Sequence, residues 1–303
     1  LAGAPLMADE FVKTTNRLPP GSVGDPDNVW FGKDIFPLGH TIEDGPSCAL
    51  RDGKVVCPAR EVPIFHRTDV VVVGGGPAGF AAAIAAARTG AKVALVERYG
   101  SLGGLFTNGM VLIMLCTSQR LAGGTWRLVT RGLTEEFADR AIALGDYVCR
   151  PRPAKLERTH WQPTVDPEGA KYLMDTMVAE EKIDMFFHCW GVDVVQQGNR
   201  VLGVVFESKQ GKQAILAKQV VDCTGDGDVL FAAGGNYRQI THGIGHVVRL
   251  ANMDRVTAKA PPRGADGKVK APVLDKWPTR SNEANPSTWW GNFGTGPKGN
   301  GLD

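Results

Sequence analysis

The feature that most constrains the fold is a strand–loop–helix–strand unit at residues 69–97. Four consecutive valines, Val70–Val73, follow Asp69 and indicate a strand buried on both faces, as in a parallel sheet. After a glycine loop, an alanine-rich helix is predicted to run to Arg88, with Gly90 just past its end. A second strand is predicted over Lys92–Glu97. The unit has the length of a β–α–β crossover, so the sequence predicts an α/β fold.

The loop between the first strand and the helix reads G-x-G-x-x-G from Gly74 to Gly79. Gly74 permits the tight turn, Gly76 lets the main chain approach a pyrophosphate, and Gly79 lets helix and strand pack closely. The helix N-terminus attracts phosphate, and Pro77 suits its first turn. Glu97, 18 residues after Gly79, can accept hydrogen bonds from ribose hydroxyls. A purely structural glycine turn beside a solvated glutamate is the weaker alternative.

The sequence after Glu97 bears on which dinucleotide binds, because FAD and NAD use the same phosphate geometry. A second glycine pair, Gly103-Gly104, stands where a larger cofactor would continue beyond its pyrophosphate. This favours FAD. Covalent flavin attachment needs a His, Cys or Tyr at the ring, and residues 103–110 contain none. Noncovalent FAD is therefore expected.

The middle of the chain predicts one more helix and a β-meander. Ala170, Leu173, Met174, Met177 and Val178 form one apolar helical stripe that Asp166 could cap, so these methionines are predicted to be core residues. Apolar runs between residues 192 and 223 are separated by short turns, which is typical of an antiparallel meander. Its last strand leads to Asp222-Cys223-Thr224-Gly225.

Four ordered segments, at residues 69–79, 97–104, 166–168 and 221–228, resemble the FAD-dependent oxidoreductases of the glutathione-reductase superfamily, and most closely a group distantly related to fumarate reductase flavoproteins. The resemblance implies a Rossmann-like FAD-binding domain, a parallel sheet with an antiparallel β-meander insertion, plus part of a second substrate domain. It implies that Val192 touches adenine through its backbone and that Cys223 is a small buried hydrophobe. The residues that it implies in cofactor binding are Gly74, Gly76, Pro77, Ala78, Gly79, Glu97, Arg98, Gly104, Thr107, Val192, Thr224 and Gly225.

The resemblance covers roughly residues 61–235, which are predicted to be the FAD-binding domain, with residues 105–165 as a candidate contribution to the substrate region. Residues 1–60 are predicted to be an irregular arm and residues 236–303 an incomplete substrate or interface segment. The closing C-terminal strand and helix of the superfamily cannot be found in the sequence. A second polypeptide, made separately or by cutting a precursor, is therefore expected to supply the C-terminal half and to contact Trp289 and Trp290.

The net charge and the cysteine pattern limit the classes of binding partner and the cellular compartment that are expected. The formal net charge is only +2, which argues against nucleic acid as a partner. No apolar run is long enough to span a membrane. The cysteines show no metal-ligand spacing and indicate a reducing, cytoplasmic compartment. In an exported protein, however, Cys48 and Cys57 could be bridged across an Asp52-Gly53 turn.

These observations predict an FAD-dependent oxidoreductase that acts by hydride transfer on a small organic substrate. The alternatives are a nicotinamide-dependent dehydrogenase and a non-catalytic FAD-holding subunit of a complex. His242 and His246 are weak catalytic candidates as general bases, and no metal site is predicted because their helical i, i+4 spacing is interrupted by glycines. The substrate and the electron acceptor do not follow from the sequence.

Overall fold

The computed structural model describes residues 48–238 except 58, 60, 116, 150, 153 and 156–160, together with residues 242–243, 246–250, 289–293 and 298–299. Its centre is a six-stranded sheet in the order β7-β4-β3-β10-β9-β8. The first four strands run parallel, and the last two are antiparallel. This confirms the predicted fold class. The strands are β3 (Ile64–Val73), β4 (Val93–Val96), β7 (Asp184–Phe186), β8 (Trp190–Gln197), β9 (Arg200–Ser208) and β10 (Gly211–Asp222).

Successive residues of β3 and β4 enter two different cores. Val72 and Leu95 pack with Phe80 and Ile84 on the helical face, whereas Val71 and its neighbours pack against the meander on the opposite face. Side chains alternate between the two faces of a strand, so one run of valines contributes to the cores on both faces of the sheet. Each fully buried valine or leucine contributes roughly 1.5–3 kcal/mol. The strand begins at Ile64, five residues before the predicted start.

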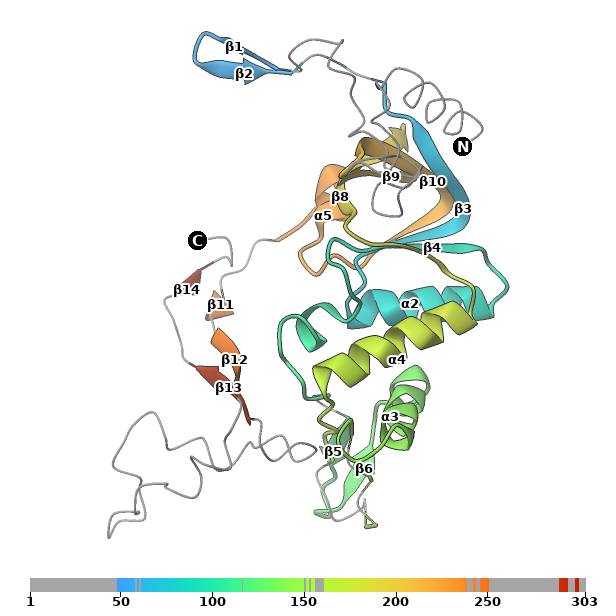
Figure 1. Cartoon of the computed structure of the whole chain (residues 1–303), viewed down its shortest axis with the longest axis vertical. Helices are drawn as coiled ribbons and strands as arrows, with labels where there is room; N and C mark the ends of the chain where they lie inside the picture. Colours follow the sequence, from blue (N-terminus) through green and yellow to red (C-terminus); the bar gives the residue numbers. More distant parts are fainter. Residues whose placement is uncertain are drawn as a thin grey trace, which may run out of the picture.

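Two helices, α2 (Pro77–Arg88) and α4 (Pro167–Glu180), lie side by side on one face of the sheet (Figure 1). The Asp166 side chain accepts hydrogen bonds from the Glu168 and Gly169 amides, which confirms the predicted cap. Met174 and Met177 are buried, as expected for core residues. The shorter helices are α3 (Leu133–Ala143), α5 (Asp228–Ala232) and the 3-10 turn η3 (Gly104–Phe106). None of the helices in the described part of the chain is both long and apolar enough to cross a membrane.

The long strand β10 pairs differently along its two halves. Residues 211–216 pair antiparallel with β9, and the strand pairs parallel with β3 up to Asp222. In the described residues, positions 217–222 therefore have a strand partner on one side only. As far as the structure describes the chain, the sheet has an open half-edge at these positions.

The remaining short strands pair locally. β5 (Ser118–Arg120) pairs with β6 (Trp126–Leu128), and β12 (His246–Leu250) pairs with β13 (Trp289–Phe293). The last pair is β11 (His242–Gly243) with β14 (Lys298–Gly299). The segment at 236–303 thus contains β-structure in its described residues, while the rest of it lies outside them.

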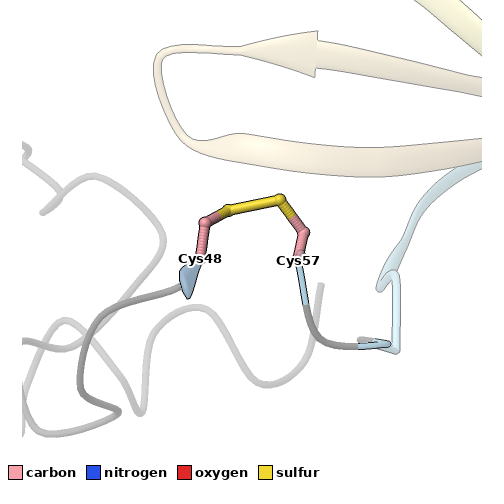
Figure 2. The surroundings of a disulfide bond; sticks show 2 residues. All are labelled: Cys48 and Cys57. Carbon is pink, nitrogen blue, oxygen red and sulfur yellow. A yellow bond between two sulfur atoms is a disulfide. The ribbon is translucent and has the colours of Figure 1, made fainter. Parts of the chain in front are cut away.

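A disulfide-bonded hairpin corrects the prediction that residues 1–60 are irregular throughout. β1 (Ala49–Arg51) and β2 (Lys54–Val56) pair across Asp52 and Gly53, which both have positive φ. Such a turn matches the twist of two-stranded hairpins. Cys48 and Cys57 flank the strands and are bonded to each other (Figure 2). All six strand residues are exposed, so the hairpin adds nothing to the core. Residues 1–47 lie outside the described residues.

Breaking this disulfide is expected to loosen the hairpin and leave the body of the protein unchanged. A lone two-stranded hairpin is marginal in water, so the Cys57→Ser variant should be cut by trypsin after Arg51 or Lys54 at least ~10-fold faster than the wild type. Its unfolding temperature should stay within about 1 °C because no buried surface is lost. Wild-type protein treated with dithiothreitol is the control. A large fall in unfolding temperature would show that the hairpin supports the body.

Candidate cofactor site

Two loop glycines are required by close backbone contacts at the end of β3. Gly74 has φ +98°, and a Cβ there would overlap the Cys223 carbonyl. A Cβ on Gly79 would overlap the carbonyl oxygen of Gly74. A side chain at Gly79 would force α2 away from the glycine loop, and a side chain at Gly74 would force that loop away from the end of β10. The sequence prediction of a tight turn and of close helix–strand packing is confirmed.

Gly76 differs from both, because a Cβ built on it would meet nothing within 4 Å. It is the N-cap of α2, provides no side-chain cap, and is followed by a first turn without acidic residues. Pro77 and Ala78 beside it are exposed. The first-turn N–H groups of a helix have no intrahelical partners and carry partial positive charge. The open space at Gly76 and these donors fit a diphosphate group.

Glu97 lies at the end of β4 and is only 5% exposed. Its Oε2 accepts a hydrogen bond from the Gly75 N–H at 2.6 Å, and its Oε1 accepts one from the Tyr99 N–H at 2.8 Å. The carboxylate therefore fixes the glycine loop, a role that the sequence reasoning missed. Two carboxylate oxygens offer about four acceptor sites, so capacity remains for the predicted ribose contact.

The second glycine pair closes over the first loop. The Gly103 N–H donates to the Gly75 carbonyl at 2.8 Å, and a Cβ on Gly104 would lie 3.1 Å from the Gly76 Cα. Thr107 is fully buried, and its hydroxyl donates to the Leu102 carbonyl at 2.6 Å. Its side chain thus shapes the second loop from inside. A direct contact of Thr107 with FAD stays a prediction.

The end of β10 forms the third side of the site. The Thr224 hydroxyl donates to Asp222 Oδ1 at 2.7 Å and accepts from the amides that open α5. Gly225 has φ +90° and open space around its Cα. Burial, and then Asp222, raises the pKa of the Cys223 thiol, which favours the neutral form and agrees with a packing role. Asp222 organises this turn, and the sequence alone did not single it out.

A pocket of about 390 Å³ lies where the adenosine end is expected. It brings together Arg98 and Val192, two predicted cofactor residues, with Trp190, His188 and Lys212. The Arg98 guanidinium lies 4.9 Å from the Tyr99 ring centroid and 5.4 Å from that of Trp190. An aromatic surface with basic neighbours suits an adenine ring and its ribose. No sequence pattern pointed to His188 or Lys212.

The two histidine candidates are less defined. The backbones of His242 and His246 lie in β11 and β12, so neither belongs to a helix that would place both side chains on one face. Their side chains lie outside the described residues, and a role as general base stays a prediction. The described residues contain no cluster of metal-binding side chains.

Together, the parallel sheet, the glycine loop and the open helix N-terminus define a dinucleotide-binding oxidoreductase fold. A model of the FAD dependent oxidoreductase family matches residues 69–289, well over half of the chain. The chain therefore belongs to the FAD dependent oxidoreductase family, and its cofactor is FAD. This confirms the resemblance that the sequence motifs indicated, and it does not favour a nicotinamide-only enzyme.

Curated relatives match over short regions. A dihydrolipoyl dehydrogenase of Trypanosoma brucei brucei is 61% identical over 46 residues, 15% of this chain and 10% of that protein. One of Manduca sexta is 45% identical over 71 residues, 23% and 14% of the two chains. A soluble pyridine nucleotide transhydrogenase of Chromohalobacter salexigens is 29% identical over 160 residues, which is 53% of this chain and 31% of that protein. The matches span a third or less of each relative's length.

Solved structures overlap with the chain only in part. The structure of THI4 from Thermovibrio ammonificans matches with 25% identity and a TM-score of 0.39, covering 55% of this chain and 61% of the other. The open conformation of a flavocytochrome c3 fumarate reductase matches with 24% identity and a TM-score of 0.34. The match covers 52% of this chain and 34% of the other. Overlaps of this size support no inference about activity.

Proposed function

We propose that this protein transfers a hydride between FAD and a small organic substrate. The observation that carries the proposal is the open space at Gly76, directly before the uncapped N-terminus of α2. It accommodates a diphosphate, while Gly74 and Gly79 keep the surrounding backbone close-packed. A pocket of about 390 Å³ lined by Arg98 and Val192 provides a candidate site for the adenosine.

Bound FAD supplies the two-electron chemistry, which a protein of this kind controls by binding and orientation. The α2 amides hold the diphosphate, Glu97 fixes the loop that carries them, and the Arg98–Trp190 surface orients the adenosine. When a substrate is oxidised, its C–H bond breaks, the electron pair leaves as hydride, and a second hydrogen leaves as a proton. His242 and His246 are the proposed candidates for accepting that proton.

Loading the full chain with FAD tests this proposal. A yellow product with absorbance near ~450 nm that bleaches on anaerobic reduction is expected for a flavoprotein. Acid precipitation should release all of the flavin, since the attachment is proposed to be noncovalent. A colourless protein that binds NAD instead would contradict the proposal. Flavin that binds but is not reduced by any substrate, even in the native assembly, would favour the non-catalytic alternative.

A second polypeptide is proposed to complete the protein, and the open half-edge of β10 supports this. Unpaired strand edges expose N–H and C=O groups that another strand can satisfy. Residues 217–222 pair only with β3 in the described residues, although Val220 and Val221 are partly buried. An added strand from the partner would extend the sheet there.

Hydrogen exchange can locate this contact. In the isolated chain, amides at 217–222 that face the open edge should exchange at least ~100-fold faster than amides of Val71 and Val72 in the centre of the sheet. In protein purified from its native source, a second polypeptide should be present and should protect the same amides. Equal protection with and without that polypeptide would contradict the proposed strand addition.

The cellular location of the protein is also a matter of proposal. The sequence favours the cytoplasm, with export as the alternative. The Cys48–Cys57 bond supports the exported alternative, because disulfides persist mainly in oxidising compartments.

A further inference from the structure

A second cavity, of about 330 Å³, lies beside the first turns of α2. The described residues of its walls come from segments far apart in the sequence: α2, η3, residues 111–115, Thr117, Thr130, α3 and Met174 of α4. None of the described residues that line it carries an ionisable side chain. A cavity of this size, apolar and with few polar groups, is typical of a small-molecule site.

Three phenylalanines form a rigid aromatic wall of the cavity. The rings of Phe80 and Phe137 meet edge to face with centroids 5.9 Å apart, and those of Phe106 and Phe137 do the same at 5.9 Å. All three side chains are buried, at 4%, 8% and 3% exposure for Phe80, Phe106 and Phe137. Fixed rings in this arrangement favour another ring packed edge to face or offset against them.

Two glutamates of α3, one of the helices that line the cavity, are already paired with arginines. On α3, Glu136 contacts Arg88 at 2.7 Å and Arg140 at 2.9 Å, and Glu135 contacts Arg152 at 2.9 Å. The polar side chains among the described lining residues are all threonines, and the Thr117 hydroxyl donates to the Trp161 carbonyl at 2.5 Å. A charged ligand would lose its hydration here without gaining an opposite charge.

The cavity borders the cofactor cradle. Pro77 lines it and directly follows Gly76 at the start of α2. Leu105 lines it and directly follows Gly104, which lies against Gly76. A molecule bound in the cavity would therefore lie next to the cofactor. Most of the residues that line it also fall within residues 105–165, the region predicted to contribute to substrate binding.

We infer that this cavity binds an uncharged, ring-containing apolar molecule of two or three rings. The further assignment of that molecule as the substrate rests on the proposed function. The cavity is built by the described chain itself, independently of any second polypeptide.

A matched pair of probes tests the ligand class. N-phenyl-1-naphthylamine is neutral, and 1-anilinonaphthalene-8-sulfonate has the same ring skeleton with one negative charge. Equilibrium dialysis against the FAD-loaded chain should show the neutral probe binding at least ~10-fold more tightly, since one uncompensated buried charge opposes binding by more than one factor of ten. Equal or tighter binding of the sulfonate, or no binding of either probe, would overturn the inference.

Two alanines of α2 provide a matched pair of variants. Ala81 lines the cavity, whereas Ala85 is exposed one turn further along the same helix. Ala81→Leu should reduce binding of the neutral probe at least ~10-fold by filling the space, and Ala85→Leu should leave it unchanged. If Ala81→Leu fails to fold, Thr134→Leu on the facing helix α3 should have the same effect. Unchanged binding in the folded cavity variant would contradict the site.

The same samples separate this inference from the proposed function. Flavin absorbance reports cofactor binding, and dialysis reports the cavity. A chain that binds no FAD but discriminates between the probes would remove the proposed function and retain the ligand class. A neutral probe that binds only to FAD-free protein would show that the flavin ring itself occupies the cavity, which overturns the inference of a separate site.

Discussion

Replacing Gly76 with valine is expected to leave the chain folded and to lower its affinity for FAD at least ~100-fold. The position has φ −67° and ψ −175°, which any residue adopts, and its Cβ would point into open space. Valine would therefore fit the protein but occupy the place of the diphosphate. Losing one or two charge-assisted hydrogen bonds to the phosphates costs about 3 kcal/mol, which corresponds to about 100-fold. Titration with FAD, followed by tryptophan fluorescence, measures the change.

Two other glycines provide the controls for this experiment. Gly123 also has open space at its Cβ but lies in the turn between β5 and β6, so Gly123→Val should keep normal FAD affinity. Gly79→Ala should act differently, because its methyl group collides with the Gly74 backbone. It should lower the stability of the fold by roughly 1–3 kcal/mol or more. Normal FAD binding by Gly76→Val would contradict the proposed position of the diphosphate.

Replacing Glu97 with alanine is expected to lower both FAD occupancy and stability. The variant leaves the buried Gly75 N–H and the part-buried Tyr99 N–H without their acceptor. An unsatisfied buried donor costs about 1–3 kcal/mol, and a part-buried one costs less. A total loss of about 3 kcal/mol would lower the unfolding temperature by about 6–12 °C in a domain of this size. FAD affinity should fall at least ~10-fold, because the loop that presents the α2 amides is no longer fixed.

Glutamine at position 97 separates the two proposed roles of this side chain, which are to hold the glycine loop and to accept a hydrogen bond from the ribose. Glu97→Gln keeps one acceptor oxygen for the Gly75 N–H but turns its NH2 group toward the Tyr99 N–H. Stability should therefore recover only in part, while FAD affinity stays reduced because one ribose acceptor is missing. The exposed Glu61 provides the neutral comparison, and Glu61→Ala should change neither quantity. Flavin occupancy that is unchanged in Glu97→Ala would remove the central support for the cofactor assignment.

Local sequence rules were sufficient for the elements of the FAD-binding domain. The glycine loop, the Asp166 cap and the meander are each determined by residues close together in the chain, and all three were predicted. The side-chain contacts that join these elements could not be predicted from local sequence. The Glu97–Gly75 hydrogen bond and the contact of Arg98 with Trp190 join residues from different strands and loops, so they depend on how the sheet is assembled.

Two failures of the sequence reasoning have specific causes. Residues 49–56 were assigned to an irregular arm, whereas the structure forms a short hairpin there. The Cys48–Cys57 bridge that closes it had been foreseen only for an exported protein. The aromatic cavity was missed because Phe80, Phe106 and Phe137 belong to three separate segments. In the sequence each of them reads as an ordinary core residue.

The open half-edge of β10 has a practical consequence for anyone producing the protein alone. Chains with exposed strand edges tend to join one another strand to strand. Lys218 of that stretch is paired with Asp69 at 2.6 Å, so its charge opposes such stacking only weakly. We expect the isolated chain to precipitate at high concentration and low ionic strength, and co-expression with the proposed second polypeptide to be the better route to crystals.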